Sequence, residues 1–161
     1  MFDRLISFLQ QLPGDTADKA EAEADRDDPR IAAAALLIHL MDADGVRLDT
    51  ERAKLSEALN RAYGLAGRDR DAFIARAEKV ERESVDLYAF TSVLKRNLDE
   101  QARIEFIGIM WEMVFADGEL SELEDNIVWR VAELIGVERR DRIAMRQRVD
   151  PQKTMGDADD E

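Results

Sequence analysis

The sequence has 161 residues and no cysteine, and its 36 acidic residues outnumber 23 basic ones to give a formal charge of −13. The absence of cysteine excludes disulfides, zinc–thiolate sites, iron–sulfur clusters and thiol nucleophiles, and the negative charge disfavours binding to nucleic acid or to anionic lipid. With 45% hydrophobic and 37% charged residues, the composition is that of one globular unit with few prolines and glycines to interrupt helices.

The N-terminal segment predicts a short amphipathic helix over residues 2–12, because its apolar side chains recur at helical spacing. Asp3 and Arg4 interrupt it, so we expect neither a signal peptide nor a membrane span, no stable membrane insertion, and a cytoplasmic location. Docking on the body of the protein is favoured over binding to a membrane surface, since Arg4 is its single basic residue. Residues 14–29 are acidic and poor in large apolar side chains, and we expect a flexible linker that makes residues 1–29 a unit outside the main domain.

Further helices are predicted wherever apolar residues lie three and four positions apart. In chain order they cover 31–41, a segment from about 49 to a glycine cap at Gly64, 69–83, 86–97, a long segment from Asp99 to a turn at Ala116, a segment that opens with a capping box at Ser121 and Glu124, and about 138–148. No alternating pattern suggests a strand, so we predict an all-α fold of about seven to eight helices. The helical domain is expected over 30–148, followed by a disordered acidic tail at 149–161.

The two halves of the chain share a pattern. Sliding the sequence along itself places residues 43–45 on residues 116–118, both of which read Ala-Asp-Gly, and it places Glu51 on Glu124. In each copy an apolar helix runs into the Asp-Gly turn and a second apolar helix follows. We therefore predict an internal duplication of two similar helix–turn–helix halves, bridged by the helix at 86–97.

Each Asp-Gly turn places an aspartate near a glutamate in the first turn of the next helix. Calcium takes several oxygen ligands, and this spacing is that of the second half of an EF-hand loop. The first half is missing, because Leu40 and Met113 stand where its first ligand would be, so a metal site would need carboxylates from both turns. The candidate ligands are Asp44, Glu51, Asp117 and Glu124, with weaker candidates at Asp42, Asp49, Glu119 and Glu122.

A purely structural interpretation of the turns stands beside the metal site. Glycine supplies the left-handed conformation that follows many helices, and carboxylates near helix N-termini are electrostatically favourable. On that interpretation the turns bind nothing.

Other residues that could carry chemistry are interpreted as structural. His39, the single histidine, lies on an apolar helix and is assigned a structural role. Trp111 and Trp129 have the spacing of a packed helix face and are assigned to the core, and the charged residues of 78–83 are interpreted as a solvated face. Because no motif assembles a nucleophile, a base and an orienting group, we expect no enzymatic activity.

Three segments resemble the TerB family, which is named for bacterial tellurite resistance. They are the two Asp-Gly turns, the stretch ESVDLYAFT over 83–91 and the stretch WEMVFADGEL over 111–120, and the resemblance covers about residues 30–148. It implies an all-helical fold of two similar halves, an association with tellurite resistance and stress response, divalent-metal binding through acidic residues, and no enzymatic activity. Val46 and Arg47 depart from the family pattern, and the basic Arg47 beside the carboxylates weakens the first site relative to the second.

Two functional hypotheses follow. In the first, the chain is a stress-associated protein that binds a divalent cation, calcium in preference, at the two turns. In the second, it is an interaction module whose acidic or apolar surface binds a basic protein partner, with structural turns only. Direct binding of an anion such as tellurite is disfavoured by the charge of −13.

Overall fold

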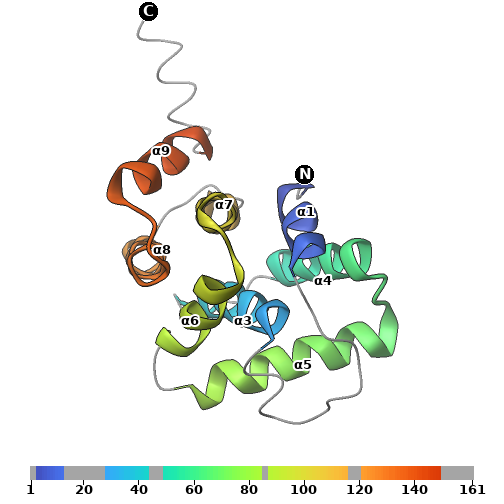
Figure 1. Ribbon diagram of the computed structural model, residues 1–161. Coiled ribbons are helices and arrows are strands. Elements are labelled where there is room, and N and C mark those ends of the chain that lie inside the picture. The colour runs from blue at the N-terminus through green and yellow to red at the C-terminus, as the bar shows by residue number, and fades with distance from the viewer. Residues whose placement is uncertain (1–2, 13–27, 44–48, 85–86, 116–120, 150–161) are drawn as a thin grey trace, which may run out of the picture.

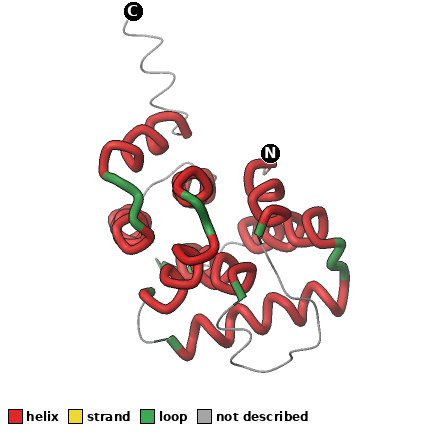
Figure 2. The backbone as a smooth tube through the Cα atoms, in the orientation of Figure 1, coloured by secondary structure: helices red, strands yellow, loops and turns green. Residues whose placement is uncertain are grey.

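Helix is the only regular secondary structure in the residues that the computed structural model describes, which are 3–12, 28–43, 49–84, 87–115 and 121–149 (Figure 2). The prediction of an all-α fold is confirmed, and the starts of the described helices differ from the expected ones by two residues or fewer. In chain order the helices are α1 (Asp3–Gln11), α3 (Pro29–Met41), α4 (Asp49–Tyr63), α5 (Gly67–Glu83), α6 (Tyr88–Asn97), α7 (Glu100–Phe115), α8 (Glu122–Ile135) and α9 (Arg139–Val149). None of them is long and apolar enough to cross a membrane.

Helix α3 lies at the centre of the fold, where it packs on α5, α6 and α7 (Figure 1). It is apolar on every face, and each residue from 31 to 38 is buried, as expected for a helix that other helices surround. It begins at Pro29, inside the segment assigned to the linker. The reason is local: the Asp28 carboxylate accepts the backbone N–H of Arg30 at 2.9 Å, and proline suits the first helical position. The remainder of the predicted linker lies outside the described residues.

Helix α1 docks on α4 and α7, which confirms the docking prediction (Figure 1). Leu5 and Leu9 are fully buried against the body. Arg4 forms ion pairs with Glu105 at 2.8 Å and Glu112 at 3.3 Å, both on α7. The apolar face of α1 is therefore covered by protein.

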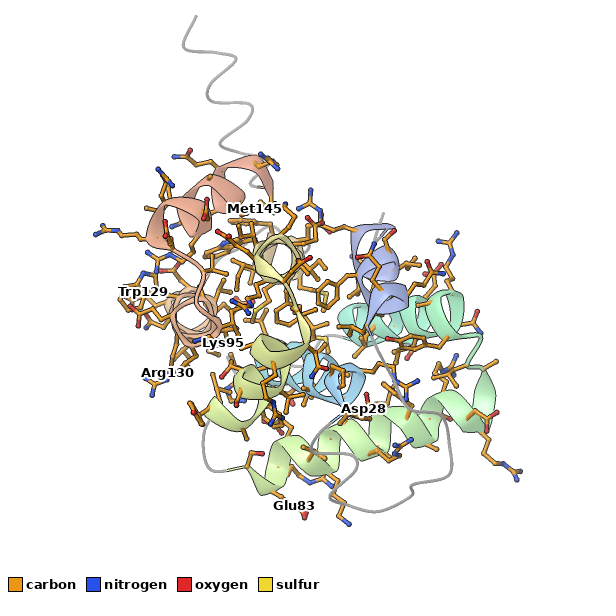
Figure 3. The ribbon with its side chains drawn as sticks, in the orientation of Figure 1. Asp28, Glu83, Lys95, Trp129, Arg130 and Met145 are labelled. Atoms are coloured by element: carbon orange, nitrogen blue, oxygen red, sulfur yellow. The ribbon has the colours of Figure 1, made fainter. Side chains whose placement is uncertain are left out.

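Helices α7, α8 and α9 form the other side of the molecule. Residues 106–111 of α7 are buried, and Gly108 allows close approach, since a Cβ there would lie 2.8 Å from the Arg4 guanidinium nitrogen Nη1. Helix α8 ends at Gly136, whose φ of 83° is left-handed. Helix α9 packs on α7 with Met145 buried between them, as Figure 3 shows.

The assignment of both tryptophans to the core is correct for Trp111 and wrong for Trp129. Trp111 is 2% exposed, whereas Trp129 is 45% exposed and lies on the outer side of α8 (Figure 3). The buried stripe of α8 runs through Val128, Val131 and Ile135. Trp129 follows Val128 directly, so it is turned away from that stripe by about 100°.

Packing in the two halves follows a common scheme. Helix α3 packs on α5 as α7 packs on α9, and α1 packs on α4 as α6 packs on α8. Helix α6 therefore holds the position in the second half that α1 holds in the first, and is more than a bridge between halves. This scheme agrees with a duplication, which itself stays a prediction.

Candidate functional site

Most of the predicted metal ligands fall outside what the structure describes. Asp44, Asp117 and Glu119 lie in undescribed segments. The backbone of α4 is described from Asp49 onward, but the side chains of Asp49 and Glu51 are not. In the described part of the chain, no three acidic or histidine side chains gather closely enough to hold a metal ion.

Glu124 is described, and it forms the capping box that the sequence predicts. Its backbone N–H donates to the Ser121 hydroxyl at 3.1 Å, and its Oε1 accepts the Ser121 backbone N–H at 3.2 Å. Its side chain is buried, with the residue 7% exposed. One carboxylate oxygen thus closes the first turn of α8, so Glu124 has a structural role whether or not a metal binds.

The two weaker candidates that are described take different positions. Asp42 is the C-terminal cap of α3, with its backbone N–H donating to the Ile38 carbonyl oxygen at 3.0 Å. Glu122 is exposed in the first turn of α8, where a carboxylate interacts favourably with the helix dipole.

A cavity of about 380 Å³ lies where the ends of α3 and α5 meet α6 and α8. Its apolar wall consists of Leu87 and Phe90 from α6 and its N-cap, with Leu123 and Ile127 from α8. Leu123 lines the cavity and is 54% exposed, so the cavity presents an apolar side chain to solvent. The volume suits one large apolar side chain or a small organic group.

The polar side of this cavity is built around the single histidine. His39 Nδ1 lies 2.9 Å from Glu81 Oε1, which joins the last turn of α3 to the last turn of α5. The interpretation of residues 78–83 as a solvated face is therefore wrong for Glu81, while Glu83 is exposed at the end of α5 (Figure 3). The pair spans 42 positions in sequence, and no local pattern could have found it.

Three further polar residues complete the lining: Ser84, Asn126 and Arg130. The Ser84 hydroxyl donates to the Val80 carbonyl oxygen at 2.8 Å, and it is therefore directed to its own helix. Arg130 is exposed on α8 beside Trp129, as Figure 3 shows. The arrangement has the features of a binding cavity, namely an apolar wall with a few polar groups at its rim.

Two helices that flank the Asp-Gly segments in sequence contribute to the cavity. His39 belongs to the last turn of the helix that precedes the first Asp-Gly turn, and Leu123 belongs to the first turn of the helix that follows the second. The C-terminal end of α3 and the N-terminal end of α8 thus meet at one cavity. This juxtaposition depends on the contact of α3 with α8, which sequence alone does not reveal.

A comparison with protein families finds a match over residues 30–147 to the model of Tellurite resistance protein TerB. The chain belongs to the TerB family. The TerB match extends from α3 into α9 and leaves α1 outside, although α1 contributes to the same core. No curated protein and no solved structure gives a significant match.

Proposed function

We propose that this TerB protein is a non-enzymatic cytoplasmic protein of the stress response, associated with tellurite resistance, that binds a divalent cation through the acidic residues of its two Asp-Gly turns. The supporting observation is that His39, before the first turn, and Leu123, after the second, line one cavity. Because the helix before the first turn and the helix after the second meet at this cavity, we expect carboxylates from both turns to reach a common ion, as a calcium site of several oxygen ligands requires.

The ligands in this proposal are Asp44 and Glu51 from the first turn and Asp117 and Glu124 from the second. Glu124 uses Oε1 in the capping box, and a carboxylate retains further lone pairs for a metal ion. An all-oxygen donor set of this kind favours calcium over transition metals. In the described cavity the Ser84 hydroxyl donates its hydrogen bond to a backbone carbonyl oxygen and is not paired with a base. This agrees with a binding role for the cavity.

Thermal unfolding of the chelator-treated full chain tests the proposal. Calcium should raise the midpoint by mass action, since a ligand at about 100 times its Kd stabilises a protein by about 2.7 kcal/mol. Magnesium and sodium chloride at matched ionic strength serve as controls, because screening alone affects a chain of charge −13. Equal midpoints with calcium and with the matched sodium chloride would contradict calcium binding.

Two variants separate metal binding from capping. Glu124→Gln keeps an oxygen that accepts the Ser121 N–H but removes the negative charge, so it should retain stability and reduce the calcium shift. Ser121→Ala removes the capping hydroxyl, which costs about 1 kcal/mol, and should leave the calcium shift intact. Glu133→Gln, at an exposed position of α8, is the matched charge control. A full calcium shift in Glu124→Gln would remove Glu124 from the site.

The cavity favours the interaction module as a second candidate function. An apolar side chain of a basic partner would enter beside Leu123, and the negative field of the chain would attract the flanking positive charges. This function predicts that a basic peptide with one central leucine binds without metal and that Leu123→Ser weakens it. Fluorescence anisotropy at low and high salt measures both effects, and binding unchanged in Leu123→Ser would place the peptide elsewhere.

A further inference from the structure

The charge of α9 is opposite to that of the chain. Its sequence RRDRIAMRQRV contains five arginines and one aspartate, in a protein whose formal charge is −13. Four of the five arginines are exposed: Arg139, Arg140, Arg146 and Arg148. A strongly cationic helix is thus present on an otherwise acidic molecule.

Little of this positive charge is neutralised by ion pairs. Arg140 lies 3.8 Å from Glu138 and Arg146 lies 3.7 Å from Asp125, and both pairs are solvent-exposed, where such contacts contribute little. Neither Arg139 nor Arg148 forms an ion pair with another described residue. Both side chains are exposed.

An exposed aromatic side chain lies beside these arginines. The guanidinium carbon of Arg142, on α9, is 4.7 Å from the centre of the Trp129 ring on α8. Arg142 is buried, at 7% exposure, while the indole is 45% exposed. The buried guanidinium group therefore packs against the Trp129 ring through a cation–π contact, while part of the ring stays exposed to solvent.

Ile143 adds an apolar contact on α9 itself. It is 40% exposed, and helical geometry places it on the same face as Arg139, Arg140 and Arg146, which are three or four positions away. Among the described residues, four large hydrophobic side chains are exposed, and Trp129 and Ile143 are two of them. We call Trp129, Arg139, Arg142, Ile143 and Arg146 the α8–α9 surface.

We propose that the α8–α9 surface binds an acidic peptide segment of a partner protein, with an apolar side chain of that segment seated against Trp129 and Ile143. Planar guanidinium groups bind carboxylates in a bidentate manner, and exposed tryptophan and arginine together are typical of residues that dominate binding energy. Asp125 and Glu133 of α8 also face Arg142, so they restrict carboxylates of the partner to the α9 side. This inference is independent of the proposed metal site.

A short acidic peptide suits this surface better than a nucleic acid. The positive charge is confined to one helix of 11 residues, and the rest of the chain carries an excess of acid that repels a long polyanion. A few carboxylates around one apolar residue match both the extent and the composition of the surface.

Fluorescence anisotropy of the full chain tests the inference with a labelled peptide in which a Leu-Phe pair is flanked by glutamates. Three comparison ligands separate the contributions: the same peptide with glutamine for glutamate, the same peptide with alanine for Leu-Phe, and a single-stranded oligothymidylate of similar charge. We expect the acidic peptide to bind at low salt at least about tenfold more tightly than each of the three. Equal binding of the glutamine peptide overturns the role of charge, and equal binding of the oligothymidylate overturns the assignment to peptide.

Variants locate the binding on the molecule. Arg139→Gln with Arg146→Gln, both exposed members of the α8–α9 surface, should weaken binding of the acidic peptide by about tenfold or more, and Trp129→Ala should have a similar effect. Arg61→Gln with Arg68→Gln, at exposed positions on α4 and α5, changes the net charge equally and should alter binding less than about twofold. Circular dichroism confirms the fold of each variant. Equal losses in the two arginine pairs, or no loss in the first, overturn the proposed surface.

Discussion

Tyr63 links three parts of the fold at the scale of a single residue. Its hydroxyl donates to the Leu9 carbonyl oxygen of α1 at 2.6 Å, and the guanidinium carbon of Arg30 lies 5.5 Å from its ring centre. Its ring also lies 6.2 Å from that of Phe73 on α5. Burial is the main reason that the pKa of Tyr63 is raised; Asp28 raises it further, and Arg30 opposes the shift.

This raised pKa predicts a loss of stability at alkaline pH. The phenol ionises near pH 10 in the unfolded chain, whereas in the folded protein it stays protonated at that pH. The contribution of Tyr63 to the free energy of unfolding is therefore complete below pH 10 and is lost as the pH rises through the folded pKa. Tyr63→Phe should lower the free energy of unfolding by about 1 kcal/mol at neutral pH, because the hydrogen bond is lost. Above pH 10 the free energy of unfolding of this variant should decrease less steeply than that of the wild type. Urea unfolding at several pH values measures this, with the exposed Tyr88→Phe as control. Parallel curves for wild type and Tyr63→Phe would contradict it.

At the scale of elements, α1 shows that the structural unit is larger than the family match. The match begins at residue 30, yet α1 fills a site on α4 and α7 with Leu5 and Leu9 fully buried. In the packing scheme of the two halves it corresponds to α6, which lies inside the match. The core of this protein thus includes an N-terminal helix that the predicted domain boundary at residue 30 leaves out.

Leu9→Ala should therefore destabilise the whole fold. Truncating a fully buried leucine costs about 2–5 kcal/mol, because transfer energy is lost and a cavity is left. Gln10→Ala, at an exposed position of the same helix, should change the unfolding free energy by about 0.5 kcal/mol or less. Urea unfolding of both variants is the measurement. A loss in Leu9→Ala no larger than in Gln10→Ala would mean that α1 contributes little to stability.

At the scale of the whole molecule, charge is distributed unevenly. The chain carries a formal charge of −13, but α9 has five arginines and one aspartate. The net charge alone predicts a basic partner. That prediction takes no account of where the charges lie on the molecule. The α8–α9 surface has the opposite charge, so the partner that we propose for it is acidic.

Self-repulsion in so acidic a chain predicts that salt stabilises it. Raising sodium chloride from about 0.01 M to about 0.15 M shortens the screening length from about 30 Å to about 8 Å, which weakens repulsion between distant carboxylates. We expect the unfolding midpoint to rise by about 2–4 °C, equivalent to about 1 kcal/mol for a chain of this size. Calorimetry at pH 7 measures the change. A midpoint that falls with salt would mean that ion pairs such as Arg4 with Glu105 outweigh the repulsion.

The sequence by itself determined the helices and their caps, because these depend on neighbours within one or two turns. The capping box at Ser121 and Glu124 and the glycine that ends α4, with φ of 69° at Gly64, are local in this sense. The family resemblance was also contained in the sequence, since it rests on contiguous stretches such as residues 111–120. Four of the predicted metal ligands were likewise chosen by spacing alone, and they remain predictions.

Only the tertiary structure decided which helix faces meet. His39 contacts Glu81 because α3 packs on α5, and Leu123 joins them in one cavity because α8 approaches α3. Trp111 and Trp129 look alike in sequence, but one is buried and the other exposed, since rotation about a helix axis is set by the partner helix. Such contacts join residues far apart along the chain, and periodicity specifies an apolar face without specifying what covers it.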